Sequence, residues 1–277
     1  MIMIKKLLGA IAISLTFTAA FASEGGYPLD RAPDRINNLA SLQNGAKLFV
    51  NDCLNCHSAN SMRYNALTQI GLTDEEIKKN LLFTGDRVGD MMHIAMTPAD
   101  GKKWFGTAPP DLSVMARAKG VDYIYTYLRS FYRDTSKLTG WDNLVFPSVA
   151  MPNPLWQMQG PRALTRISIH EAEKPDGKTQ WERVTAKYDA QGFSEVKTEA
   201  LSNYRGPAIS KDTFEAGNQA KTAEFDNNVA DISNFLAWMA EPSQLFRKKL
   251  GVWVMLFLAL FLLVAWRLNA AYWKDVK

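Results

Sequence analysis

The chain has 277 residues and a formal net charge of +4, and most of its basic charge lies at its two ends. Residues 1–22 carry +2 and residues 247–277 carry +5, so residues 23–246 carry −3. This mildly acidic segment lacks the clustered basic charge that nucleic-acid binding requires, and no nucleic-acid partner is expected. It could instead steer a basic protein partner toward itself, or simply be a solvated surface.

Residues 1–22 are typical of a signal peptide. Lys5 and Lys6 precede an apolar run, Leu7–Phe17, and residues 20–22 supply a small-residue cleavage site. The alternative is an uncleaved N-terminal anchor, for which the apolar run is short. The signal peptide predicts that the residues after it are exported.

The chain has two cysteines, and both lie in Cys53-Leu54-Asn55-Cys56-His57. Two thiols at this spacing can bond to the two vinyl groups of a haem, and the next imidazole can then ligate the iron. The motif therefore predicts one covalently bound haem c, with His57 as a metal ligand. The main alternative is a redox dithiol, as in a periplasmic thiol-disulfide oxidoreductase. A zinc site is disfavoured because it needs four ligands.

A short helix is predicted to lead into the cysteine loop. Leu39, Leu42, Ala46 and Phe49 recur at helical spacing. Gly45 on this helix indicates either close packing against another element or a merely tolerated glycine.

The next segment, residues 58–67, is predicted to be a polar wrap around the haem edge, and a helix with acidic residues in its first turn begins at Thr73. Residues 88–106 are predicted to be irregular, and their clustered methionines are expected to fill the core rather than bind iron. The clustered methionines are Met91, Met92 and Met96.

Two prolines stiffen the loop of residues 106–113. A rigid apolar loop suits the side of a haem that carries the histidine, where a backbone carbonyl can accept the second ring N–H of His57. Asp122 is then expected to cap a helix over residues 123–132.

Met151 is the candidate for the second axial ligand. It stands immediately before Pro152, which holds it in extended backbone within a loop. Besides methionines, the chain offers His93 and His170 for this role. The alternative interpretation of Met151 is a core methionine.

A small β-hairpin is predicted after this loop, with strands over 166–171 and 181–188 joined by a turn at 175–177. Its His170 is expected at the surface rather than at the iron. Residues 191–222 are expected to be loop-like, and a helix is predicted over 227–239, ending at Glu241-Pro242.

Near the C-terminus, 17 residues from Leu250 to Trp266 carry no charge and predict one transmembrane helix with aromatic residues near its ends. Three parts follow from this pattern: a signal peptide over 1–22, an exported haem domain over 23–246, and an anchor with a short cytoplasmic tail over 247–277.

Five stretches in order give the chain a resemblance to the cytochrome c1 family over nearly all of residues 23–277. The resemblance implies a mainly α fold, with a class I cytochrome c-like helical haem domain, long insertions and a small β-hairpin. It also implies thioether bonds at Cys53 and Cys56, and His57 and Met151 as axial ligands. The stretches are Cys53–Ser58 with Met62–Tyr64, Ala108–Ser113 with Ala116–Ala118, Asp122–Tyr125, Ala150–Pro152 and Trp238–Pro242.

The same resemblance implies that Pro110 packs beside the haem and that a basic side chain pairs with a haem propionate. The family often has Arg-x-Arg where this chain has Arg117-Ala118-Lys119, so either Arg117 or Lys119 is the candidate. A lysine would not provide the bidentate geometry of an arginine.

The implied function is that of the haem subunit of ubiquinol:cytochrome c reductase. Such a subunit accepts electrons from a Rieske iron-sulfur protein, passes them to cytochrome c, and lies beside cytochrome b in a dimeric complex of the bacterial inner membrane, with its haem domain in the periplasm. It is not an enzyme on its own. The alternatives are an anchored cytochrome c that feeds a terminal oxidase, a thiol-disulfide enzyme, and a membrane-tethered structural protein.

Overall fold

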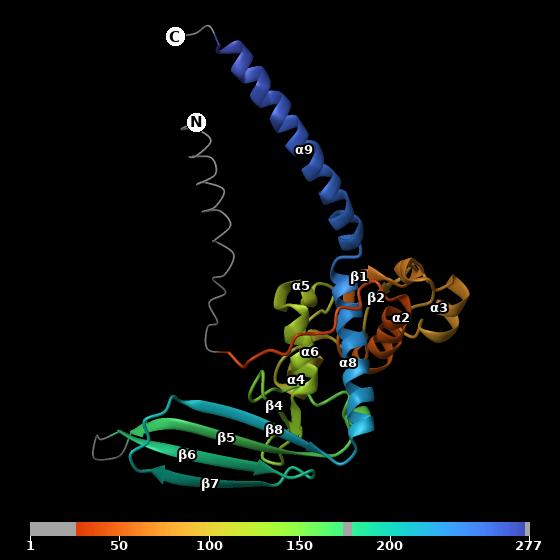
Figure 1. The fold of residues 1–277 in the computed structure, drawn as a ribbon. Coiled ribbons are helices and arrows are strands. Elements are labelled where there is room, and N and C mark those ends of the chain that lie inside the picture. The colour runs from red at the N-terminus through yellow and green to blue at the C-terminus, as the bar shows by residue number, and fades with distance from the viewer. Residues whose placement is uncertain (1–25, 174–178, 275–277) are drawn as a thin grey trace.

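The computed structural model describes residues 26–173 and 179–274. A helical domain, a four-stranded sheet beside it and a long helix that leaves the domain make up this part of the chain (Figure 1). The predicted signal peptide lies outside the described residues. Helices contribute most of the secondary structure, so the prediction of a mainly α protein is confirmed. The class I assignment stays a prediction.

The predicted helix before the cysteines is α2, Leu39–Leu48, and it continues as a π-helical turn, η1, Phe49–Cys53. The Asn38 side chain caps α2 by accepting from Ser41 N–H. Leu39 is 52% exposed and does not belong to the core, because it is the first residue of the helix and lies on its solvent side. The other apolar positions of the predicted stripe are buried.

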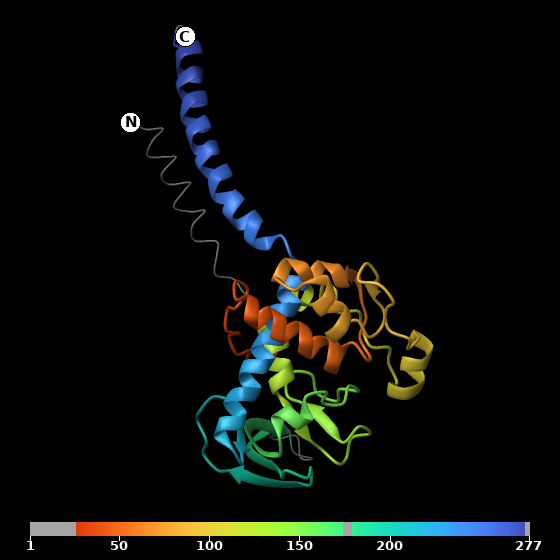
Figure 2. The same cartoon turned by 90° about the vertical axis from the view of Figure 1, so that its right-hand side faces the viewer.

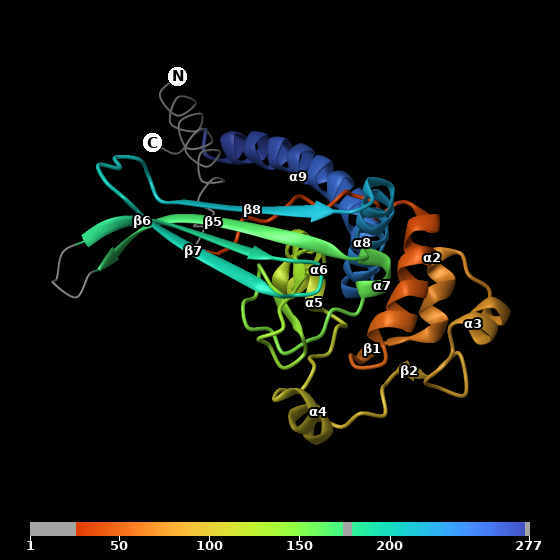
Figure 3. The ribbon, with the colours of Figure 1, turned by 90° about the horizontal axis from the view of Figure 1, so that it is seen from below.

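Helix α2 packs against α8, Gln219–Ala240, as the orthogonal views of Figures 1 and 3 show. A Cβ atom on Gly45 would lie 2.3 Å from the Asp231 backbone oxygen and 2.6 Å from Phe235 Cβ. Gly45 therefore marks a close contact between the two helices, and the interpretation of a merely tolerated glycine is wrong.

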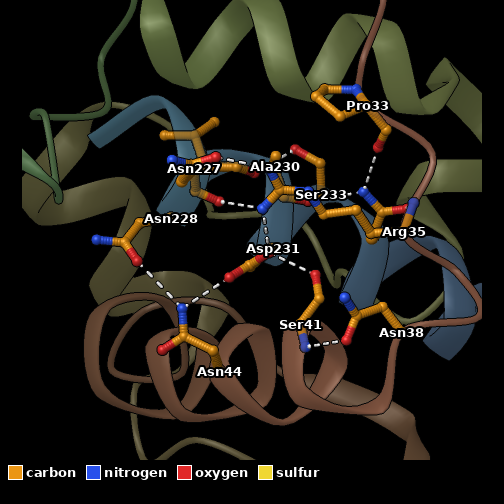
Figure 4. Close-up of polar contacts among 12 residues, drawn as sticks. Pro33, Arg35, Asn38, Ser41, Asn44, Asn227, Asn228, Ala230, Asp231 and Ser233 are labelled. Atoms are coloured by element: carbon orange, nitrogen blue, oxygen red, sulfur yellow. Dashed lines mark hydrogen bonds and ion pairs between the residues drawn. The ribbon is translucent and has the colours of Figure 1, made fainter. Parts of the chain in front are cut away.

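A polar network around Asp231 joins three segments at this contact (Figure 4). The carboxylate accepts from Arg35 Nη1 at 2.8 Å, from Asn44 Nδ2 at 2.8 Å and from the Ser41 hydroxyl. The Asn234 side chain adds two contacts, because its Oδ1 accepts from Arg35 N–H and its Nδ2 donates to Pro33 O. The extended segment before α2 is thereby fastened to both helices.

The segment after the cysteines contains β1 (Ala59–Arg63), the 3₁₀ helix η2 (Tyr64–Ile70) and α3 (Asp74–Asn80), followed by β2 (Met91–Met92) and α4 (Pro98–Phe105). The predicted helix start at Thr73 is confirmed, with a capping box to Glu76. The prediction of irregular structure over 88–106 is wrong at α4, which begins with a second capping box between Thr97 and Asp100. Met92 is fully buried in the core.

The next elements are α5 (Met115–Lys119), α6 (Val121–Arg129), β3 (Phe131–Arg133), β4 (Trp141–Asn143) and α7 (Trp156–Gln159). Asp122 is not the cap of α6. Gly120 holds that position with φ 91°, and the Asp122 carboxylate instead accepts from Ala32 N–H at 2.8 Å. The predicted helix also ends too late, because Phe131 and its neighbours pair with β4.

The sheet has the antiparallel strand order β7-β6-β5-β8, with β5 Arg162–Glu173, β6 Thr179–Tyr188, β7 Ser194–Leu201 and β8 Ile209–Ala216. The predicted pairing of β5 with β6 is confirmed, whereas its turn at 175–177 lies outside the described residues. The prediction of a loop over 191–222 is wrong because β7 and β8 extend the hairpin on both sides. Helix α8 likewise begins before the predicted residue 227.

The sheet is fixed to the helical domain at one end. Leu164 is buried with Tyr132 and Leu144, and Tyr27 from the N-terminal segment packs against the same cluster. The far end of the sheet projects away from the helices (Figure 3).

Helix α9, Gln244–Tyr272, contains the predicted apolar span. An 18-residue stretch of this helix has a mean hydropathy of 2.2, and none of that stretch is buried within the described part of the chain. The helix leaves one end of the domain after the break at Glu241-Pro242 (Figure 2). A helix of 29 residues is long enough to cross a bilayer.

Candidate haem site

The two cysteines and His57 lie in one tight turn at the end of η1. Backbone N–H groups of Cys56 and His57 both donate to Cys53 O, at 3.1 and 2.9 Å. The two thiols form no disulfide. Burial raises the pKa of both thiols, that of Cys53 to about 12. A reactive dithiol instead has a lowered thiol pKa, so this turn does not have the electrostatics of a thiol-disulfide enzyme.

The His57 ring is oriented by the proline loop. Its Nδ1 lies 2.8 Å from the backbone oxygen of Pro110, the kind of contact that the sequence indicated for this loop. A carbonyl only accepts, so Nδ1 carries the proton and the lone pair lies on Nε2. Burial lowers the pKa of His57 despite the opposing contact with Pro110, which favours the neutral ring that a metal ligand requires.

Asp111 pins the proline loop to the segment that follows His57. Its carboxylate accepts from the Ser58 hydroxyl at 2.9 Å, from Asn60 N–H at 2.7 Å and from Ser113 N–H at 2.8 Å. Burial alone would raise the pKa of Asp111, but these hydrogen bonds lower it overall. This role of Asp111 was not predicted from the sequence, although Asp directly after two prolines is a common turn signal.

Helix α4 supports the same loop from its other side. A Cβ atom on Gly101 would lie 2.8 Å from Pro109 Cδ and 3.2 Å from Ala108 Cα. Gly101 thus lets the helix approach the prolines closely. The loop is therefore held between α4 and the residues after His57.

Met151 lies in a loop that two buried polar residues hold at its start. The Asp142 carboxylate accepts from Ser148 N–H at 2.6 Å and from Val149 N–H at 3.3 Å. The Asn143 side chain accepts from the backbone N–H groups of residues 145 and 146. Beyond the methionine, Asn153 Nδ2 donates to Gln159 Oε1 at 2.7 Å. These contacts fix the path of the loop on both sides of the thioether.

The Met151 side chain is half-buried against an aromatic cluster of Phe131 and Trp141 with Val149. The Tyr127 hydroxyl on α6 donates to its sulfur at 3.4 Å. Tyr127 was not predicted as a site residue, because an aromatic residue at helical spacing is usually a core residue.

Arg117 and Lys119 are exposed on α5, which directly follows the proline loop. Neither side chain makes a hydrogen bond or an ion pair within residues 26–173 and 179–274. Lys119 Nζ lies 5.8 Å from the centre of the Tyr123 ring. The contacts do not favour one of the two basic residues over the other.

Together these residues fit a covalently attached haem. They offer two free thiols, one oriented imidazole and one thioether. The described residues contain no group of three or more His, Cys, Asp or Glu side chains that could hold a metal ion. Such a donor set suits haem iron, whose remaining four ligands come from the porphyrin.

Comparison with known proteins gives the family. The Cytochrome C1 family matches residues 35–161 and 202–276, which is more than half of the chain. The chain belongs to the cytochrome c1 family. It is the haem subunit of the cytochrome bc1 complex, which also contains cytochrome b and the Rieske protein, and it carries a covalently bound c-type haem. It transfers electrons and is not catalytic by itself.

Individual relatives extend over almost the full chain. A protein named cytochrome c1 from Allochromatium vinosum is 37% identical over 273 residues, covering 98% of this chain and 99% of the relative. A protein named ammonia monooxygenase gamma subunit from Nitrosomonas europaea is 38% identical over 274 residues, covering 99% of each chain. The mitochondrial cytochrome c1 haem protein of Saccharomyces cerevisiae is 24% identical and covers 96% of this chain and 79% of the relative.

Membership of this family agrees with the exposed apolar helix α9, because cytochrome c1 is anchored to the membrane in bc1 complexes. The alternatives of a cytochrome that feeds a terminal oxidase and of a thiol-disulfide enzyme are not favoured.

Proposed function

We propose that Cys53 and Cys56 hold the haem of this cytochrome c1 through thioether bonds, and that His57 and Met151 are its axial ligands. The observation that carries this assignment is the His57 ring, which the Pro110 carbonyl orients within the same turn as the two thiols. When bound, the haem iron supplies one-electron chemistry. A nitrogen and a thioether as axial ligands favour the reduced state and give a high midpoint potential.

The other site residues prepare this arrangement. The Pro110 carbonyl fixes the tautomer of His57 and makes the ring a stronger donor, while the Pro110 side chain packs beside the porphyrin. Asp111 keeps the loop in register with the residues after His57. Arg117 or Lys119 pairs with a propionate, since both side chains are exposed next to this loop.

The electron enters from the Rieske iron-sulfur protein and leaves to a cytochrome c, and cytochrome b lies beside α9 in a dimeric complex. The haem domain is periplasmic, because the predicted signal peptide precedes it. The single span crosses the inner membrane of a bacterium, and the last residues lie in the cytoplasm. The mildly acidic domain supports a basic electron acceptor. The class I cytochrome fold belongs to the same proposal, supported by the close packing of α2 on α8.

The Met151→Ala variant tests the ligand assignment. We expect its midpoint potential to fall sharply, because the ferrous state loses its thioether ligand, while the haem stays covalently attached. The measurement is a redox titration of the variant in its purified membrane complex. Met96→Ala is the matched control, since Met96 is also half-buried but lies before α4. An unchanged potential in Met151→Ala would overturn the assignment of Met151.

A further inference from the structure

The hydroxyl of Tyr127 has one polar partner in the described part of the chain, and that partner is the sulfur of Met151, at 3.4 Å. A thioether is a weak acceptor with no proton to give, so the hydroxyl must be the donor. Tyr127 is half-buried and contacts both the main core and the cluster around Met151. The hydroxyl donates to a weak acceptor here, because water or a carbonyl oxygen would accept a stronger hydrogen bond than a thioether sulfur.

The Tyr127 ring has little freedom to move. It stacks on the Tyr123 ring with centroids 6.0 Å apart, and it meets the Phe131 ring edge-on at 5.1 Å. The Tyr127 carbonyl accepts from Asn143 Nδ2 at 2.8 Å and from the Ser130 hydroxyl at 3.1 Å. The backbone and the ring of this residue are thus both fixed, which gives its hydroxyl a defined position.

Asn143 fixes the partner loop at the same time. It is fully buried, and its Oδ1 accepts from Val145 N–H at 2.9 Å and from Phe146 N–H at 3.1 Å, in the stretch that leads to Met151. One amide therefore ties the α6 backbone at Tyr127 to the beginning of the Met151 loop. This arrangement sets the distance between the hydroxyl and the sulfur from both sides.

We propose that Tyr127 is a positioning residue whose hydroxyl holds the Met151 sulfur and raises the midpoint potential of the haem. This inference rests on the proposed function, in which Met151 is an axial ligand. A hydrogen bond to the sulfur withdraws electron density from it and makes it a weaker donor to the iron. A weaker donor lowers the stability of ferric iron more than that of ferrous iron, so the midpoint potential rises. The hydroxyl also limits the rotation of the side chain, which keeps the thioether directed to one place.

The test is Tyr127→Phe in the full chain, purified in its membrane complex. The substitution removes one oxygen atom and keeps the ring contacts. We expect the ratio of reduced to oxidised haem at a fixed potential to fall roughly threefold, which is a downward shift of about 30 mV at ~59 mV per tenfold change. Tyr125→Phe is the matched control, because Tyr125 lies on the same helix and its hydroxyl has no hydrogen-bond partner among the described residues; its potential should not change.

A second readout separates this inference from the ligand assignment. Ferric haem with a thioether ligand has a weak charge-transfer band in the red, which should be present in the unsubstituted protein and in Tyr127→Phe. Absence of the band from the unsubstituted protein would refute Met151 as a ligand, and the inference with it. A band in both proteins with equal midpoint potentials would refute the role of Tyr127 alone. A band in both with a lower potential in Tyr127→Phe would support the inference.

Discussion

The α2–α8 helix pair and the four-stranded sheet belong to the same chain but are specified in different ways. The helix pair is buried on its inner face and allows no side chain at Gly45, and the haem-binding turn follows directly from it. Among the described strand residues of the sheet, Leu164 and Ile169 of β5 are buried, and β7 is almost wholly exposed. The family match stops at residue 161 and resumes at 202, so β5, β6 and β7 lie between the two matched parts. The comparison indicates that the haem site depends on the helix pair and not on the sheet.

The largest effect is expected at the contact between α2 and α8. Gly45→Ala places a methyl group where the Asp231 backbone oxygen is 2.3 Å away, so the backbone of α2 or α8 would have to shift to relieve the clash. We expect a loss of about 3 kcal/mol in the free energy of unfolding. Denaturant unfolding measures this loss. Gly89→Ala is the control, because a Cβ atom there meets nothing within 4 Å; equal stability of the two variants would show that the helices are not closely packed.

A smaller effect that spares the haem is expected in the sheet. Leu164→Ala removes buried apolar surface where the sheet meets Tyr132. We expect a loss of about 2 kcal/mol in the free energy of unfolding. Hydrogen exchange should show faster exchange in β5 and β8, while the midpoint potential stays the same. Leu138→Ala, at a position 93% exposed, should change neither quantity. A changed midpoint potential in Leu164→Ala would show that the haem site does depend on the sheet.

The smallest effect concerns the loop that orients His57. Because the pKa of Asp111 is lowered in the folded protein, its stabilising contribution is complete above the ordinary aspartate pKa of about 3.9 and is lost as the pH falls through the lower folded value. We expect Asp111→Asn to lower the free energy of unfolding by about 1 kcal/mol at neutral pH, after allowance for solvent screening. The difference from the unsubstituted protein should shrink in acid. The control is Asp189→Asn, which affects the turn between β6 and β7. It should leave hydrogen exchange unchanged at the Asn60 amide, which donates to Asp111. A difference that persists in acid would contradict this role.

Helices α2, α3 and α9 followed from the sequence because their signals are local, whereas α4 was missed. Apolar spacing marked α2, a capping residue marked α3, and an uncharged run marked the span in α9. The hairpin of β5 and β6 was also predicted, because β-branched residues alternate with polar ones on either side of a turn.

The strands β7 and β8 were missed for a physical reason. Their side chains are mostly polar and exposed, so no apolar alternation distinguishes them from a loop. Their order comes from backbone pairing, β7 with the preceding strand β6 and β8 with the more distant strand β5. The end of α6 was misplaced similarly, since the aromatic residues after Arg129 fit a helix or a strand equally well by spacing.

The candidate site divides along the same line. Cys53, Cys56 and His57 form a contiguous motif, and Met151 could be named from its proline neighbour. Tyr127 and Asn143 could not, because Tyr127 contacts Met151 across 24 positions and Asn143 contacts Tyr127 across 16, and no local sequence pattern predicts either contact. The pKa shift of Asp111 likewise depends on partners that only the folded loop supplies.

The most direct test of the central claim is a visible spectrum of the chain after full denaturation and reduction. The protein should be produced with residues 1–22, the predicted signal peptide, in a cell that can attach haem c, and then unfolded and separated from free cofactors. Thioether bonds at Cys53 and Cys56 predict that haem absorbance stays with the unfolded chain, and that it is lost when both cysteines are replaced by serine. A colourless unfolded chain would contradict the account.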